Sequence, residues 1–181
     1  MTNQNIVLPS IALRGTTILP GMIVHFDVSR ERSIKAIEAA MLHDQKIFLV
    51  TQKDPEVETP DASGVYQVGT IAYIKQVVKL PQNLLRVLVE GIGRGLLVKF
   101  EQEFPFLRSE ITPVDEESIQ MPEALMEAMH RSLKELFHRY CMENGKISKE
   151  LVTQILNIEQ IEELVEQIAV NLPLSYQNKQ K

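Results

Sequence analysis

Cysteine is nearly absent from this sequence. Among its 181 residues there is a single cysteine, Cys141, so no disulfide can form within the chain. A chain of this length buries roughly 70% of its unfolded surface on folding, and one or two compact domains can therefore form without disulfides. A lone cysteine fits a reducing compartment.

Basic residues are not in excess either. The sequence holds 19 Lys and Arg against 24 Asp and Glu, which gives a net charge of −5 and a pI near 5.4. Proteins that bind nucleic acid through its phosphates usually present a clustered basic face. Since no such cluster is visible, the composition argues against DNA binding.

Long apolar runs are also missing. No stretch approaches the roughly 20 apolar residues that a membrane-spanning helix needs. Residues 1–5 are polar and lack the basic and apolar regions of a secretory signal, and no Asn-x-Ser/Thr sequon occurs. These absences predict a soluble, cytoplasmic protein that does not bind a membrane.

Short β-type segments fill the first 114 residues. They are rich in β-branched and large apolar side chains, and Gly and Pro separate them. Residues 71–77 and 85–90 alternate between apolar and polar side chains, which favours antiparallel pairing with one face in water. The predicted strands are residues 6–13, 22–28, 46–51, 66–80, 84–89, 96–100 and 106–112.

One helix is expected within this β-rich half. Ser29 can cap its N-terminus, and Ile34, Ile37 and Met41 then fall on one face, before the pair His43-Asp44 ends it. A single helix among many short strands suggests a curled sheet or small barrel with the helix packed on it.

The hydrophobic period becomes helical from Pro122 onward. Pro122 suits the first turn of a helix, and Asn144-Gly145 closes that helix. Ser148 can cap a second helix, and Asn157 with Gln160 resembles the capping box of a third. This pattern predicts about three helices.

The two halves meet at an acidic, turn-rich connection, residues 113–118. The expected fold class is α+β. We expect a β-rich lobe over residues 1–115, a helical lobe over 119–174 and a polar tail over 175–181.

Recognisable catalytic motifs are missing as well. The cluster Gly91-Ile92-Gly93-Arg94-Gly95 does not match G-x-G-x-x-G, because Leu96 occupies the position of the last glycine. Neither a P-loop nor a G-x-S-x-G motif occurs. A β-type run follows Gly95, so the glycines are interpreted as a turn between two strands. We predict no catalytic and no cofactor-binding residue.

The histidines and the cysteine do not form a metal-ligand pattern. His130 and His138 lie about two helical turns apart, and His138 with Cys141 supplies only two ligands. Acidic pairs such as Glu162-Glu163 are typical of solvated helix faces. We therefore predict no bound metal, a surface His138 and a partly buried Cys141.

Short segments along nearly the whole chain follow a familiar order and spacing. They are residues 8–9, 13–14, 19–22, 28–33, 38–41, 46–53, 68–72, 79–81, 86–91 with Arg94, 155–158, 168–169, 172–174 and 179–180. Together they resemble the N-terminal domain of ATP-dependent Lon proteases (LonA type, endopeptidase La). Ser29, Gln82-Asn83 and Gly95 depart from the family's usual glycine, Asp-Gly and alanine, which are changes that turns and caps tolerate.

The resemblance implies a fold and a role. It implies a PUA-like pseudo-barrel followed by a helical lobe. It also implies a non-catalytic fragment that stops where the family's connecting helix begins, before the ATPase module with its ATP and Mg²⁺ and before the Ser-Lys protease domain. The implied partners are unfolded or degron-bearing polypeptides and other Lon subunits in a homohexamer. Two alternatives stay open: a free-standing Lon-N-like interaction module, and an RNA-binding PUA-like domain, which the acidic composition disfavours.

Polypeptide-binding residues are expected among apolar side chains beside turns, because unfolded proteins expose apolar groups that native proteins bury. Core packing is an equally good interpretation for Met22 and Leu84. An exposed strand edge is a different route, through main-chain hydrogen bonds to an extended peptide, but the sequence does not identify the edge. The candidates are Leu19, Pro20, Met22, Leu80, Pro81 and Leu84.

Overall fold

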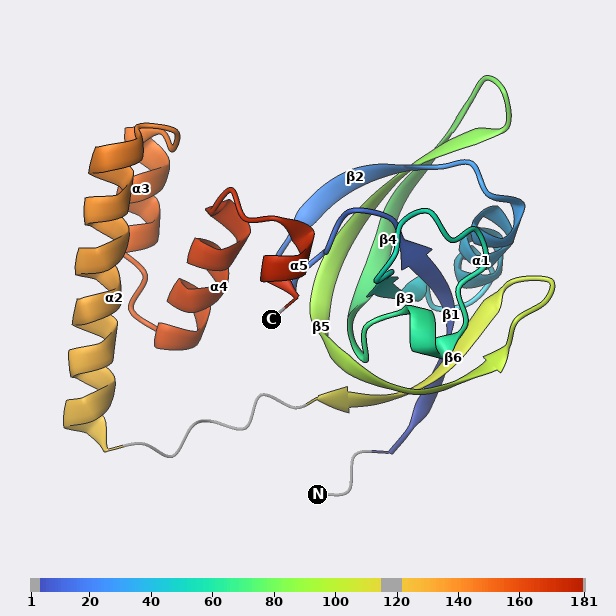
Figure 1. Cartoon of the computed structure of the whole chain (residues 1–181), viewed down its shortest axis with the longest axis horizontal. Coiled ribbons are helices and arrows are strands. Elements are labelled where there is room, and N and C mark those ends of the chain that lie inside the picture. The colour runs from blue at the N-terminus through green and yellow to red at the C-terminus, as the bar shows by residue number, and fades with distance from the viewer. Residues whose placement is uncertain (1–3, 115–121, 181) are drawn as a thin grey trace. The chain divides into compact units, whose positions relative to one another are not determined.

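The computed structural model describes residues 4–114 and 122–180, which divide into two compact units (Figure 1). The first unit contains Met1–Asp115 and Ser175–Lys181, and the second contains Glu116–Leu174. Most of the predicted connection, residues 115–118, lies outside the described residues. The mixture of a sheet and separate helices confirms the α+β class.

A six-stranded sheet forms the first unit, in the order β2-β5-β4-β3-β1-β6. β5 also pairs with β6, so five strands close into a barrel, and β2 extends the sheet beyond it (Figure 1). Only the β1–β3 pairing is parallel among the described strands. The strands are β1 (Ile6–Leu13), β2 (Ile23–Val28), β3 (Lys46–Thr51), β4 (Val68–Leu80), β5 (Leu84–Gln102) and β6 (Leu107–Val114).

The predicted turn at Gly91–Gly95 is wrong, because β5 runs through it as one 19-residue strand. None of the three glycines has a positive φ; Gly91 and Gly95 instead let other groups approach closely. A Cβ on Gly91 would lie 2.5 Å from the Leu19 carbonyl oxygen, and one on Gly95 would lie 3.1 Å from the Phe48 ring. The unbroken β5 can therefore pair with β2 near its start and with β6 near its end.

Helix α1 (Glu31–Met41) packs on the barrel as expected. Ile34 and Ile37 are buried in the core between α1 and the sheet, whereas Met41, at the last position, is 39% exposed. The predicted Ser29 cap is wrong: Arg30 occupies the cap position and makes no side-chain cap bond. A second buried cluster, around Phe48 and Ile111, fills the barrel. A short 3₁₀ turn, η1 (Ala62–Gly64), lies in the loop after β3.

Three helices form the second unit: α2 (Glu123–Asn144), α3 (Lys149–Leu156) and α4 (Ile161–Asn171). Gly145 ends α2 in the left-handed conformation, and the Ser148 hydroxyl accepts a hydrogen bond from the Leu151 amide, so both predicted signals are confirmed. The predicted capping box is wrong, because Gln160 caps α4 without a side-chain bond. The core of this unit is Phe137, Cys141, Ile155, Leu164 and Ile168.

The polar tail contains a short helix, α5 (Tyr176–Lys179), which belongs to the first unit. The Thr17 hydroxyl donates to the Tyr176 carbonyl at 3.2 Å, and the side-chain amide of Gln180 donates to the Val68 carbonyl at 2.7 Å. No helix in the described ranges is long and apolar enough to cross a membrane.

Candidate functional site

Strand β2 is the exposed edge that the sequence does not identify. Within residues 4–114 and 122–180, β5 is the only strand that pairs with it. The backbone N–H and C=O groups on its other side therefore lack a strand partner. Such an edge is a template for an added strand.

The outer face of β2 carries one large apolar side chain among polar ones. Ile23 is 66% exposed, while Val24 and Phe26, which alternate with the outward residues, pack against the core. On the same face, Arg86 of β5 donates two 2.8 Å hydrogen bonds to the Asp27 carboxylate. These bonds hold the pKa of Asp27 below its ordinary value, so the pair is ionised at neutral pH.

Leu19, Pro20 and Met22 lie in one turn that precedes β2. The Gly21 amide donates to the Gly91 carbonyl at 3.0 Å, and the Gly91 amide donates to the Met22 carbonyl at 2.9 Å. Pro20 is buried, Leu19 is half-buried, and Met22 is half-buried against the core. In this turn, Leu19 and Met22 offer apolar surface to a ligand and Pro20 does not.

Leu80, Pro81 and Leu84 lie at the tip of the β4–β5 hairpin, which projects from the barrel (Figure 1). Leu80 pairs directly with Leu84 across the hairpin; both are half-buried, and Pro81 is exposed. These three residues form a second, separate apolar group.

The structure does not bring the two groups together, but β2 runs between them. The turn that contains Met22 contacts Gly91, whereas Leu84 lies seven residues earlier on β5, or roughly 23 Å at about 3.3 Å per residue. β2 pairs with β5 over this interval, from Ile23 opposite Glu90 to Val28 opposite Leu85. The candidate site is therefore an open strand edge with an apolar group near each end. We refer to it as the β2 edge surface.

Neither Ile23 nor the open edge was predicted from the sequence. The alternation Ile23-Val24-His25-Phe26 predicts a strand with two unlike faces, but not which face is covered. The identity of an edge strand depends on pairings such as that of β5 with β6, which join residues far apart in sequence.

Among the described residues, no group of three or more His, Cys, Asp or Glu side chains is arranged to hold a metal. Burial raises the pKa of the Cys141 thiol, which is the opposite of what a reactive cysteine needs. The Nε2 atom of His130 makes a 3.0 Å hydrogen bond with the Ile158 carbonyl within the helical unit, so this ring nitrogen already has a partner in the fold.

A closed barrel with a helix packed on it, an open strand edge and a separate helical unit define an α+β domain of the pseudo-barrel class, and the comparisons give its family. Residues 7–181 match the family described as the ATP-dependent protease La (LON) substrate-binding domain. The chain belongs to this family.

Curated relatives agree along nearly the whole chain. Lon protease of Lachnoclostridium phytofermentans is 46% identical over 96% of the chain, and Lon protease of Clostridium acetobutylicum is 39% identical over 99%. Lon protease 1 of Bacillus subtilis is 36% identical over 96%. The chain spans only 21%, 23% and 22% of these relatives, respectively.

Solved structures share the fold. The N-terminal domain of Mycobacterium avium complex Lon protease superimposes with a TM-score of 0.75 at 19% identity, covering 97% of this chain and 88% of that one. The Lon N-terminal domain protein from Xanthomonas campestris gives a TM-score of 0.56 at 14% identity, covering 93% and 99%. The pseudo-barrel followed by a helical lobe is therefore the Lon N-terminal fold.

Proposed function

We propose that this chain is the substrate-recognition domain of an ATP-dependent Lon-type serine protease and binds unfolded or degron-bearing polypeptides. The match of residues 7–181 to a substrate-binding domain carries this proposal. ATP hydrolysis with Mg²⁺ and peptide-bond hydrolysis then belong to the parts of the protease beyond the fifth that this chain spans. The parent protein would act in the cytoplasm as a homohexamer that degrades misfolded and short-lived regulatory proteins.

The β2 edge surface supplies a physical route for this recognition. An extended polypeptide can add to β2 through main-chain hydrogen bonds, which every sequence offers, while its apolar side chains contact Ile23, Met22 or Leu84. Native proteins bury most large apolar side chains and pair their strands, so they offer few such segments. One domain binds weakly by this route, and several copies in a ring gain avidity.

The test compares binding of the purified chain to a permanently unfolded protein and to the same protein in its native form, by fluorescence anisotropy. We expect preferential binding to the unfolded form. Ile23→Lys should weaken this binding about fivefold, because partial burial of an isoleucine side chain contributes roughly 1 kcal/mol.

The matched control is Leu42→Lys. Leu42 is 83% exposed and follows α1 outside β2, so this variant adds the same charge at another exposed apolar position. Equal weakening by the two variants would refute the role of β2. Absence of any binding to unfolded protein at high chain concentration would argue against recognition by the isolated domain and would favour a role in ring assembly.

A further inference from the structure

A small cavity of about 200 Å³ lies between the ends of β1 and β2. Ile11–Leu13 line one side and Phe26–Val28 line the other. β1 pairs with β6 only through Ile6–Ser10, and β2 pairs only with β5 among the described strands. The cavity therefore occupies a gap between two strand edges that no described strand fills.

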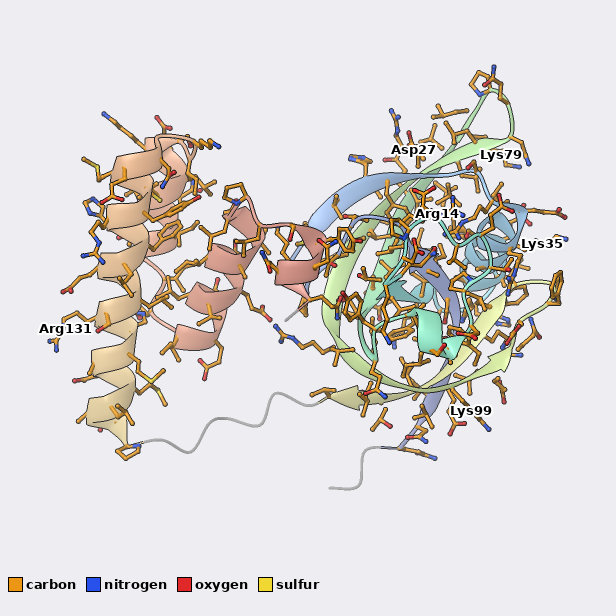
Figure 2. All side chains as sticks on the ribbon, in the orientation of Figure 1. Arg14, Asp27, Lys35, Lys79, Lys99 and Arg131 are labelled. Atoms are coloured by element: carbon orange, nitrogen blue, oxygen red, sulfur yellow. The ribbon has the colours of Figure 1, made fainter. Side chains whose placement is uncertain are left out.

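Two arginines contribute positive charge to this cavity. Arg30 is fixed by three neutral acceptors: the Ala12 carbonyl, the Gln52 side-chain oxygen at 3.0 Å and the Glu58 carbonyl at 3.1 Å. Arg14, labelled in Figure 2, donates to the Val57 carbonyl at 3.3 Å. No carboxylate of the described residues forms an ion pair with either guanidinium.

The surroundings of Arg30 reflect this concentration of positive charge. Burial lowers its pKa most, the nearby guanidinium groups of Arg14 and Arg32 lower it further, and only Glu58 acts in the opposite direction. A bound anion would relieve this repulsion. The one carboxylate in the cavity wall, Asp27, is already held by Arg86.

Ser33 supplies a second and independent feature. It lies in the first turn of α1, is only 7% exposed, and lines the cavity. Its hydroxyl makes no hydrogen bond to the described residues, so it can donate to a group bound in the cavity. Arg30 also leaves the α1 N-terminus without a side-chain cap bond, and the acidic residue of the first turn, Glu31, is paired with Lys35 at 2.7 Å.

We propose that this cavity binds a small oxyanion, a carboxylate or phosphate group, between Arg14, Ser33 and the first turn of α1. Two sources offer this chemistry: the terminal carboxylate of a polypeptide and free inorganic phosphate. The cavity lies beside Phe26–Val28, the last residues of β2. A bound polypeptide that pairs with β2 could therefore place its terminal carboxylate in the cavity. The proposed anion site is independent of polypeptide binding at the β2 edge surface, because phosphate binding in the cavity would be enough to establish it.

The test is a titration of the isotope-labelled 181-residue chain, followed by the NMR shifts of the Arg30–Ser33 amides at constant ionic strength. One titration uses inorganic phosphate, a second uses acetyl-trialanine with a free carboxylate, and a third uses the same peptide as its amide. We expect saturable shifts with phosphate or with the acid peptide, and none with the amide.

Arg14→Gln should weaken the binding about tenfold, because it removes a charge-assisted hydrogen bond. Ser33→Ala should weaken it severalfold and keep the fold, because the hydroxyl has no protein partner to lose. Arg131→Gln is the matched charge control on α2 (Figure 2). Ser109→Ala is the serine control, since Ser109 on β6 is a buried serine outside the cavity.

The outcomes separate the sources. Saturation by phosphate alone supports a free anion as the ligand, and saturation by the acid peptide supports a polypeptide terminus. Shifts that rise linearly to the highest concentration with both probes would overturn the proposal. Equal weakening by Arg14→Gln and Arg131→Gln would overturn it as well, because the effect would then follow net charge and not this cavity. Polypeptide binding to the β2 edge surface, measured separately, can fail without affecting either result.

Discussion

Gly91 shows how one absent side chain shapes the β2 edge surface. Its backbone exchanges hydrogen bonds with the turn before β2, accepting from the Gly21 amide and donating to the Met22 carbonyl. A Cβ at this position would meet the Leu19 carbonyl oxygen at 2.5 Å and the Thr70 methyl group at 3.1 Å. The turn before β2 therefore packs directly against the β5 backbone at Gly91.

We predict that Gly91→Ala lowers the free energy of unfolding by about 2 kcal/mol, because backbone atoms must move to admit the methyl group. Gly93→Ala is the matched control, since a Cβ on Gly93 meets nothing within 4 Å. It should be neutral or slightly stabilising, by less than about 1 kcal/mol. Urea unfolding followed by circular dichroism measures both values. Similar effects of the two substitutions would show that close approach does not explain Gly91.

The residues of the candidate site were predicted only in part. Sequence reasoning selected Leu19, Met22, Leu80 and Leu84 because each is apolar and near a turn, and the structure leaves each of them half-buried. Pro20 meets the same local rule but is buried. Its burial follows from the approach of the turn to Gly91, some 70 residues later, which no local pattern describes. Binding by any of these residues stays a prediction.

At the scale of elements, the β4–β5 hairpin contains strained backbone near its tip. Gln82 and Asn83 have φ of 63° and 57°, in the left-handed region. The left-handed conformation costs a residue with a Cβ roughly 1 kcal/mol, although asparagine tolerates this conformation better and glycine adopts it freely. The hairpin therefore holds an unfavourable residue at Gln82, among the three apolar residues of the candidate site at this tip, Leu80, Pro81 and Leu84.

We expect Gln82→Gly to leave stability unchanged or raise it by up to about 1 kcal/mol, because glycine relieves the strain but adds freedom to the unfolded chain. Gln76→Gly is the control in β4, where Gln76 is exposed, pairs with Leu88 and does not have a positive φ. That substitution should cost about 1 kcal/mol. Denaturant midpoints of the two variants give the comparison, and a cost at Gln82 equal to that at Gln76 would contradict the assignment of strain.

Elements were predictable where their signals are local. Ser148 and Gly145 act on amides and carbonyls within a few residues, and both predictions are confirmed. The interpretation of Gly91–Gly95 as a turn failed because the reason for these glycines is distant. Gly95 makes room for Phe48 on β3 and Ile111 on β6, so its role is visible only when the barrel is closed.

At the scale of the whole molecule, the chain returns to its first unit after the helical one. Residues 175–181 are grouped with the barrel, although 59 residues, Glu116–Leu174, separate them from it in sequence. α5 is a single short turn, with the Ser175 hydroxyl accepting from the Asn178 amide. Its composition is polar, so hydrophobic periodicity gave no indication of this return. Hydrogen bonds at Tyr176 and Gln180 hold it to the barrel.

Deletion of residues 175–181 should destabilise the barrel by about 1–2 kcal/mol, since each of the two hydrogen bonds contributes roughly 0.5–1.5 kcal/mol. In the deletion variant, we expect faster hydrogen exchange of the backbone amides near Thr17 and Val68, which are the residues that the tail contacts. Gln180→Ala should reproduce part of this effect around Val68, whereas Asn178→Ala, which keeps the backbone amide that Ser175 caps, should not. Unchanged exchange at Val68 in the deletion variant would mean that the tail is not bound to the barrel in solution.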